Sequence, residues 1–163
     1  MRNYNIAVVG ATGLVGNTII KILEERKFPI DNIYFLSSKR SAGSTIKFNG
    51  KDYIVEELTD KSFDKNIDIA LFAAGGAVSE KFAKVAVEKG VKVIDNSSVF
   101  RMDKDVPLVV PEVNGEEVKN NNGIIANPNC TTTQAVVALK PLHERFNIKR
   151  IIYSTYQAVP GSG

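Results

Sequence analysis

The chain has 163 residues, of which 44% are hydrophobic and 24% charged, and its formal net charge is +3. This composition is typical of a soluble globular protein, and the length suits one domain, or one domain and the beginning of a second. Because lysine and arginine form no cluster or stripe, we expect no nucleic-acid partner, whereas a mild positive charge suits anionic small molecules.

Cysteine content and hydropathy narrow the class of protein further. Cys130 is the only cysteine, which excludes an internal disulfide framework and fits a reducing compartment. The N-terminal residues lack the apolar core of a signal peptide, and no apolar run approaches the roughly 20 residues of a membrane span. We therefore predict a cytoplasmic protein without a membrane partner, and we expect no metal site.

The beginning of the chain predicts a βαβ unit. Residues 6–9 form a short continuous apolar run, as expected of a strand buried on both faces. A glycine-rich turn at 10–16 follows, and apolar residues then recur at helical spacing up to residue 26. Residues 33–36 form the second apolar run. Strand, turn, helix and strand within about thirty residues are typical of this unit.

The middle of the chain predicts more strands and one more helix. Asn49-Gly50 stands between the runs 46–48 and 53–55, which predicts a hairpin with a mirror-image turn. A helix is expected to start near Ser79 and to stop at the following glycine, residue 90. Buried strands are expected at residues 67–73, 91–95, 108–110 and 124–126. The fold class is therefore α/β, with a Rossmann-type doubly wound parallel sheet.

The last part of the chain predicts a helix and a strand. A helical pattern follows Cys130 and extends to residue 146, and Pro141 is expected to kink or split this helix. Its inner side is expected to carry Val136, Val137, Leu139, Leu142 and Phe146. Residues 151–156 predict a new strand that leads into a glycine-rich end. We divide the chain into a nucleotide-binding domain, residues 1–133, and the beginning of an incomplete second domain, residues 134–163.

Three glycines in the first turn have the spacing G-x-x-G-x-x-G, which is related to the dinucleotide-binding fingerprint. Gly10 permits the tight turn, Gly13 lets the backbone approach a pyrophosphate, and Gly16 lets the helix pack on the strand. A tight turn without a ligand is the alternative, but the strand before and the helix after favour a phosphate site. Its main-chain N–H donors would be those of Thr12, Gly13, Leu14 and Val15.

The end of the second strand favours NADP over NAD. An NAD enzyme usually places an acidic residue there for the adenine ribose, whereas this chain has Ser37-Ser38-Lys39-Arg40-Ser41. Hydroxyl groups and a guanidinium bind a 2′-phosphate through charge-assisted hydrogen bonds, and a carboxylate would repel it. The alternatives are a solvated basic loop, and turn or helix-cap roles for the two serines 37 and 38.

Cys130 lies where the apolar run at 124–126 passes into the predicted helix. Unpaired N–H groups and the positive end of the helix dipole stabilise a thiolate at that place. A small buried residue is the alternative for a lone cysteine, but the glycine loop in the same chain favours a nucleophile. A thiolate beside a nicotinamide is suited to oxidising or reducing an aldehyde through a thioester.

Several motifs in order resemble those of the aspartate-β-semialdehyde dehydrogenases, and the resemblance extends over the whole chain. The motifs occupy residues 10–16, 41–43, 95–102, 109–114, 127–131 and 154–159. The resemblance implies NADPH-dependent reductive dephosphorylation of aspartyl-β-phosphate to aspartate 4-semialdehyde, on the route to lysine, threonine, methionine and diaminopimelate. It also implies a homo-oligomer, a dimer or a tetramer, for the complete enzyme.

The resemblance assigns roles to single residues. Cys130 is implied as the nucleophile that forms the acyl-thioester, and Gln157 as the active-site glutamine that orients the intermediate or the substrate. Arg101 and Asn129 would bind the phosphate group. The cofactor site would also take Asn96, Ala74 and Gly75, which follow predicted strands. As alternatives, Arg101 pairs with Asp103 or Asp105, and the glutamine satisfies a sheet edge.

Two features depart from the family pattern. His143 is the only histidine, and it lies about 20 Å from Cys130 along a continuous helix, too far to act as its base. The histidine base and an arginine for the substrate carboxylate belong to a C-terminal region in the family, so we expect this chain to be an N-terminal part that is inactive alone. Pro160 replaces a serine that contacts the cofactor, although Gly161 can still approach it.

Two other functions remain open. N-acetyl-γ-glutamyl-phosphate reductase uses the same cysteine chemistry, although residues 41–43 and 156–158 argue against it. An NADP-binding module without catalysis belongs to a different class. Rapid alkylation of Cys130 by iodoacetamide near neutral pH would favour a nucleophile over such a module.

Overall fold

The structure of the chain is a computed structural model that describes residues 2–156. A six-stranded parallel sheet runs through it in the order β5-β2-β1-β6-β7-β8. Its strands are β1 (Tyr4–Val9), β2 (Ile30–Ser37), β5 (Glu56–Glu57), β6 (Ile69–Phe72), β7 (Lys92–Asp95) and β8 (Ile124–Ala126). The chain proceeds outward from β1 first in one direction and then in the other, so the sheet is doubly wound as predicted.

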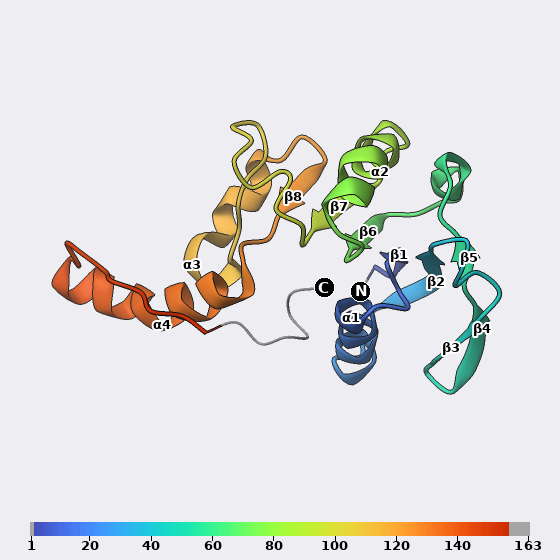
Figure 1. Cartoon of the computed structure of the whole chain (residues 1–163), viewed down its shortest axis with the longest axis horizontal. Coiled ribbons are helices and arrows are strands. Elements are labelled where there is room, and N and C mark those ends of the chain that lie inside the picture. Colours follow the sequence, from blue (N-terminus) through green and yellow to red (C-terminus); the bar gives the residue numbers. More distant parts are fainter. Residues whose placement is uncertain (1, 157–163) are drawn as a thin grey trace.

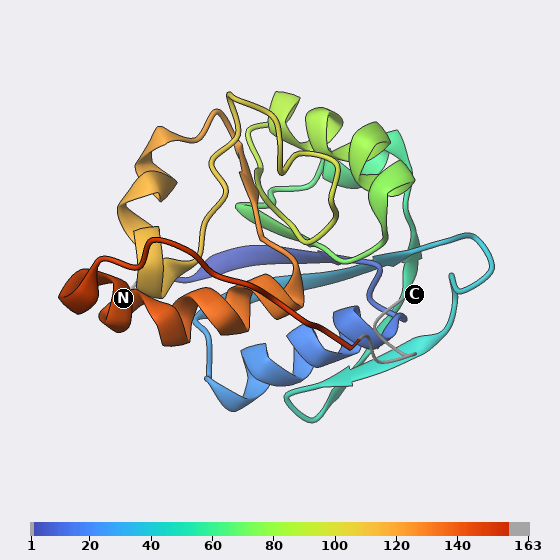
Figure 2. The same ribbon diagram turned by 60° about the vertical axis from the view of Figure 1, so that its left-hand side comes forward.

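Helices lie on both sides of the sheet. Helices α1 (Leu14–Glu25) and α4 (Cys130–Phe146) lie on one side, and α2 (Gly76–Glu88) lies on the other (Figures 1 and 2). The short elements are α3 (Pro111–Asn114) and the 3-10 helices η1 (Asp60–Phe63) and η2 (Gly115–Asn120). The helix that was expected to start near Ser79 begins at Gly76, because the glycine loop before it leads directly into the first turn.

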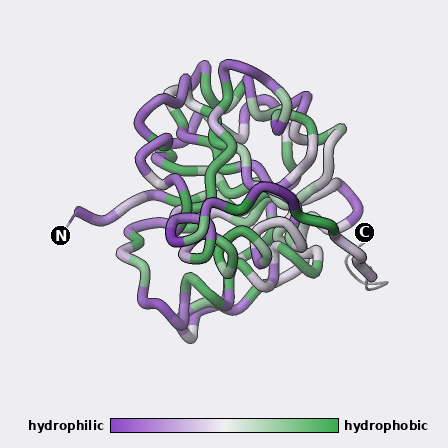
Figure 3. The backbone as a smooth tube through the Cα atoms, turned by 90° about the vertical axis from the view of Figure 1, so that its left-hand side faces the viewer, coloured by the Kyte–Doolittle hydropathy of each residue, from purple (hydrophilic) through white to green (hydrophobic). Residues whose placement is uncertain are grey.

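Two apolar cores cover the two faces of the sheet, and β1 contributes to both. Ala7 and Val9 belong to the core beneath α2, whereas Ile6 and Val8 belong to the core beneath α1. This alternation follows from the two-residue period of a strand, and it explains why residues 6–9 of this doubly covered strand are all apolar. Figure 3 shows apolar stretches in the middle of the molecule and hydrophilic stretches at many of the outer turns.

The predicted hairpin is confirmed as β3 (Thr45–Phe48) and β4 (Lys51–Ile54). Asn49 and Gly50 both have positive φ, 48° and 77°, which is the signature of the mirror-image turn. The hairpin packs against the main sheet through an aromatic contact, because the ring of Tyr53 lies 5.6 Å from that of Phe35 at nearly a right angle.

The prediction of a strand at residues 108–110 is wrong. Leu108 makes only an isolated bridge to Ala126. The N–H of Val110 donates instead to Oδ1 of Asn114 at 2.9 Å, and α3 begins at Pro111. Within residues 2–156, the ladder to β8 contains only the bonds from Val109 N–H to Ala126 and from Ala126 N–H to Pro107, and its next donors would be Pro128 and Pro111, which have no N–H, so the strand does not form.

The last described segment differs most from the sequence predictions. Helix α4 continues through Pro141, because a proline removes one main-chain bond while the turns on either side keep theirs. No residue of α4 is buried, and the expected inner residues Val137, Leu142 and Phe146 are 39%, 48% and 71% exposed. Residues 151–156 form no strand, since no strand within residues 2–156 lies alongside to complete a ladder. Their apolar part is visible as a green stretch near the surface in Figure 3.

Two features are absent from the described residues. No helix within residues 2–156 is both long and apolar enough to cross a membrane. The same part of the chain contains no group of three or more His, Cys, Asp or Glu side chains placed to hold a metal ion.

Candidate functional site

A cleft of about 590 Å³ lies at the carboxyl ends of β1, β2 and β6, where the strand order reverses. Its volume is in the range of small-molecule sites, and the reversal point is where open α/β sheets bind ligands. The cleft brings together nine predicted cofactor residues: Gly10, Thr12, Gly13, Leu14, Val15, Ser37, Ser38, Ala74 and Gly75. The first two strand ends and the loop after β6 therefore converge as the sequence indicated.

The glycine loop packs closely against its neighbours because three of its positions have no side chain. Gly10 has φ +83°, and a Cβ there would lie 2.6 Å from the carbonyl oxygen of Ala73. A Cβ at Gly16 would lie 2.1 Å from the carbonyl oxygen of Gly10, so the first turn of α1 rests directly on the loop. At Gly13 the nearest atom would be 3.4 Å away, and this glycine is exposed in the cleft. The loop therefore fits a pyrophosphate group.

Free main-chain donors face the same cleft. Helix α1 begins at Leu14, its N-cap is Gly13, and no side chain within residues 2–156 caps it. The first helical bond runs from the N–H of Asn17 to the carbonyl of Gly13. The N–H groups of Leu14 and Val15 come before that bond and have no intrahelical acceptor. The N–H of Gly13, in contrast, already donates to Gly10 at 3.0 Å. An anion here would gain from the N–H groups and from the helix dipole.

The end of β2 supplies hydroxyl groups to the cleft. Ser37 is 7% exposed, and its hydroxyl lies 2.8 Å from the hydroxyl of Thr12, so it also joins β2 to the glycine loop. Ser38 is exposed and lines the cleft. Arg40 and Ser41 follow in a turn closed by the Ser41 N–H on the Ser38 carbonyl, outside the described lining of the cleft. The side chain of Arg40 is long enough to reach a phosphate group that extends beyond the cleft.

Three apolar residues of the cleft were missed by the sequence reasoning. Val78 and Phe82 lie four positions apart on α2 and form one wall, and Leu58 follows β5. The spacing of the first pair indicates one helix face, so the helical pattern contained that signal. Leu58 is positioned by its N–H, which donates to the carbonyl of Ser37 at 2.8 Å, and nothing in the sequence pointed to it.

Cys130 is the first residue of α4 and is exposed. The residue before it, Asn129, is the N-cap, and its Oδ1 accepts a hydrogen bond from the Thr131 N–H at 2.9 Å. The cysteine therefore stands at a capped helix N-terminus, as predicted. It does not belong to the described lining of the nucleotide cleft. Because Oδ1 of Asn129 already accepts the hydrogen bond from the Thr131 N–H, only the Nδ2 group of Asn129 is available to bind a phosphate.

Arg101 does not pair with an aspartate within the described residues. Its Nε donates to the carbonyl oxygen of Asn127 at 2.8 Å, and its Nη2 donates to that of Asn96 at 2.9 Å. Asn96 also donates through Nδ2 to the carbonyl of Phe72, at the end of β6, at 3.0 Å. Neither Asp103 nor Asp105 forms an ion pair with Arg101 in this part of the chain.

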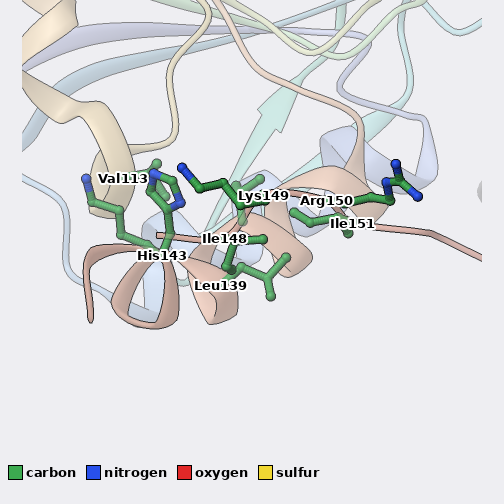
Figure 4. Close-up of a pocket in the computed structure, with 9 residues that line it drawn as sticks. Val113, Leu139, His143, Ile148, Lys149, Arg150 and Ile151 are labelled. Atoms are coloured by element: carbon green, nitrogen blue, oxygen red, sulfur yellow. The ribbon is translucent and has the colours of Figure 1, made fainter. Parts of the chain in front are cut away.

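The remaining predicted residues lie elsewhere. Gln157 and Gly161, with Pro160, lie outside the described residues. His143 stands thirteen positions beyond the cysteine on the same unbroken helix. It lines a separate hollow of about 370 Å³ between α4 and residues 148–151, together with Leu139 and Ile148 (Figure 4). The histidine therefore does not approach the thiol along the helix.

The fold and this site define a class of protein. A doubly wound parallel sheet whose glycine loop and bare helix N-terminus meet at the switch point is a dinucleotide-binding domain. The family described as "Semialdehyde dehydrogenase, NAD binding domain" matches residues 5–121, and the chain belongs to this family.

Known relatives agree with this assignment. The aspartate-semialdehyde dehydrogenase of Aquifex aeolicus is 56% identical over 98% of the chain and 48% of its own length. The Bacillus subtilis enzyme is 52% identical over 99% of the chain and 46% of its own length. The chain thus spans about half the length of the curated relatives it matches.

Solved structures agree as well. Aspartate semialdehyde dehydrogenase II of Vibrio cholerae, complexed with ASA, is 51% identical with a TM-score of 0.83, and the match covers 88% of the chain and 47% of that structure. The Candida albicans enzyme with NADP is 31% identical with a TM-score of 0.74, over 89% of the chain and 48% of that structure.

Proposed function

We propose that the chain is the nucleotide-binding and nucleophile-bearing part of an NADPH-dependent aspartate-semialdehyde dehydrogenase. The observation that carries this proposal is the pairing of two features in one chain. A glycine loop too tight for any Cβ at Gly10 and Gly16 opens on free helix N–H groups. An exposed cysteine, Cys130, begins the helix that follows β8 of the same sheet. The relatives that are 52–56% identical carry the same enzyme name.

The residues of this chain would divide the work as follows. When bound, NADPH would supply the hydride for the reduction. The Sγ of Cys130 attacks the acyl carbon of aspartyl-β-phosphate, so that a C–S bond forms and the bond to the phosphate oxygen breaks. Arg101 and Asn129 would bind the departing phosphate. Addition of a hydride to the acyl carbon of the thioester would form a C–H bond, after which the C–S bond breaks, the aldehyde leaves and Cys130 is released as a thiolate. Gln157 would orient the intermediate, and Asn96, Ala74 and Gly75 would contact the cofactor.

We further propose that the second domain begins at residue 134 and that the full enzyme is a homo-oligomer. Half of the relatives' length lies beyond what this chain spans. The side chains of Val137, Leu142 and Phe146 on α4 are exposed, as are those of Ile151 and Ile152, with Ile152 at 86%. Such a surface is suited to burial against further chain. The proton-transferring base and the arginine for the substrate carboxylate would come from that additional region.

The test is a chimera in which this chain replaces the N-terminal half of the Aquifex aeolicus relative. It should oxidise aspartate 4-semialdehyde in the presence of phosphate and NADP⁺, whereas the chain alone should not. N-acetyl-glutamate 5-semialdehyde serves as the competing substrate. If a folded chimera prefers this second aldehyde, the chain belongs to the reductase alternative and the proposal is wrong. If a folded chimera binds the nucleotide but oxidises neither aldehyde, the chain is a nucleotide-binding module without catalysis.

Arg40→Ala is expected to weaken NADPH binding by the chain at least about tenfold and to leave NADH binding unchanged. A hydrogen bond from a guanidinium to a phosphate contributes about 1.5–3 kcal/mol, and only NADPH has the 2′-phosphate. NMR titration of the chain with each nucleotide measures both affinities and tolerates weak binding. Arg26→Ala, at the far end of α1, is the matched control. Equal weakening for both nucleotides would contradict the assignment of Arg40 to the 2′-phosphate.

A further inference from the structure

Arg101 connects the carboxyl ends of two neighbouring strands through main-chain atoms. Asn96 directly follows β7 and Asn127 directly follows β8. The guanidinium donates from Nη2 to the carbonyl oxygen of Asn96 at 2.9 Å and from Nε to the carbonyl oxygen of Asn127 at 2.8 Å. Nε and Nη2 form one edge of the planar group, so a single side chain spans both acceptors.

The same two strand ends are also joined to each other and to β6. The Nδ2 of Asn127 donates to the Oδ1 of Asn96 at 2.6 Å, and the N–H of Asn127 donates to the carbonyl of Asp95 at 2.8 Å. Asn96 in turn donates to Phe72, the last residue of β6, through both its N–H and its side chain. The residue after Phe72 is Ala73, which lines the nucleotide cleft. One peptide bond, from Ala73 to Phe72, and these hydrogen bonds thus connect the wall of the cleft to Asn127.

Asn127 lies three positions before Cys130, and the segment between them is short and stiff. It contains Pro128, which is buried, and the helix cap Asn129. The proline has a restricted φ, and the cap determines the direction in which α4 starts. A shift of the Asn127 carbonyl would therefore move the thiol with it.

We propose that Arg101 is a positioning residue, whose two-pronged bond to the Asn96 and Asn127 carbonyls holds Cys130 at a defined place relative to the nucleotide cleft. The inference rests on the proposed function of Cys130 as the nucleophile. It assigns one edge of the guanidinium to the main chain, and it leaves only Nη1 and the remaining Nη2 proton for a phosphate. A lysine could still attract that phosphate as a point charge, but it could not span the two carbonyls.

The first measurement needs no variant. In the wild-type chain, the Arg101 Nε proton should exchange with water at least about tenfold more slowly than that of exposed Arg26, because it is bound to the Asn127 carbonyl. NMR spectra of the arginine side chains give both rates, in buffer without phosphate and with added inorganic phosphate. The slow rate should be present in both buffers. Equal exchange at the two arginines, or protection of Arg101 only when phosphate is present, would overturn the proposal.

The second measurement uses Arg101→Lys with Arg26→Lys as the matched control. Lysine keeps the positive charge and loses the fork, so a change reports geometry rather than charge. In phosphate-free buffer, Arg101→Lys should lose protection of the Asn127 amide and change the alkylation rate of Cys130 by at least about threefold. The control should match wild type. If Arg101→Lys differs from wild type only in phosphate binding, Arg101 is a phosphate ligand alone and the proposal is wrong.

The results for Arg101 can be distinguished from the result of the chimera experiment, which tests the proposed function. Exchange at Arg101 and Asn127 is measured without turnover, so it can support the positioning role even if the chimera proves inactive. Conversely, an active chimera with an unprotected Arg101 would keep the enzyme assignment and remove this role. If Arg101→Lys does not fold, the measurement on the wild-type side chain decides alone.

Discussion

Gly16→Ala should destabilise the chain by about 3 kcal/mol or more, which corresponds to a fall in Tm of roughly 10 °C for a domain of this size. The added Cβ would lie 2.1 Å from the carbonyl oxygen of Gly10 and 2.9 Å from the Cα of Ala11. Both atoms are main-chain atoms of the loop beneath the helix, so neither can rotate away as a side chain would. Helix α1 would have to lift from the loop.

The same substitution should also remove nucleotide binding, because lifting α1 displaces the N–H groups of Leu14 and Val15 from the loop. Thermal unfolding and NADPH titration measure the two effects. Gly115→Ala is the matched control, since Gly115 has φ −59° and no atom within 4 Å of a new Cβ. It should alter stability by less than about 1 kcal/mol, in the stabilising direction. A Gly16→Ala chain as stable as the control would contradict the packing described for the loop.

Cys130→Ser in the chimera with the Aquifex aeolicus half should lower turnover at least about 10⁴-fold while nucleotide affinity and stability remain near wild type. A serine hydroxyl is scarcely ionised at neutral pH and is a much weaker nucleophile than a thiolate. The side chain is exposed at the start of α4, and exposed substitutions usually alter stability by less than about 0.5 kcal/mol. Steady-state oxidation of aspartate 4-semialdehyde gives the loss.

Thr132→Ser provides the matched control for this prediction, because it changes an exposed residue of the same helical turn without removing a thiol. It should retain turnover within a few-fold of the unsubstituted chimera. The nucleophile assignment would be refuted by a Cys130→Ser chimera that keeps more than about a hundredth of the activity, since thioester chemistry has no substitute for the sulfur.

Local sequence patterns predicted the structure correctly where a single residue type meets a local physical requirement. The glycines at 10 and 16 were predicted from spacing, and the structure shows that a Cβ at either would meet main-chain atoms. Asn49-Gly50 was predicted as a mirror-image turn, and both residues have positive φ. The doubly covered strands β1 and β2 were recognisable by their continuous apolar runs at residues 6–9 and 33–36. Such requirements act over a few residues, so a sequence pattern can reveal them.

Contacts between distant segments were not accessible in this way. The family resemblance implied a phosphate-binding role for Arg101, and only the arrangement of β7 beside β8 places two carbonyl acceptors within reach of its guanidinium. Leu58 reaches the cleft because β5 pairs with β2 at the far edge of the sheet. Residues 151–156 have the composition of a strand, yet a strand needs a partner, and none lies beside them within the described residues.

For Cys130, some features followed from the sequence alone, whereas others depended on the tertiary structure. The sequence alone determined that a lone thiol follows an apolar run and begins a helix, because capping and helical periodicity are local properties. It also determined that a glycine loop of the dinucleotide type opens the chain. Only the tertiary structure decided how these two features are connected, through the strand order β6-β7-β8 and the bonds from Phe72 to Asn127. Strand order depends on contacts between segments far apart in the chain, which no local pattern encodes.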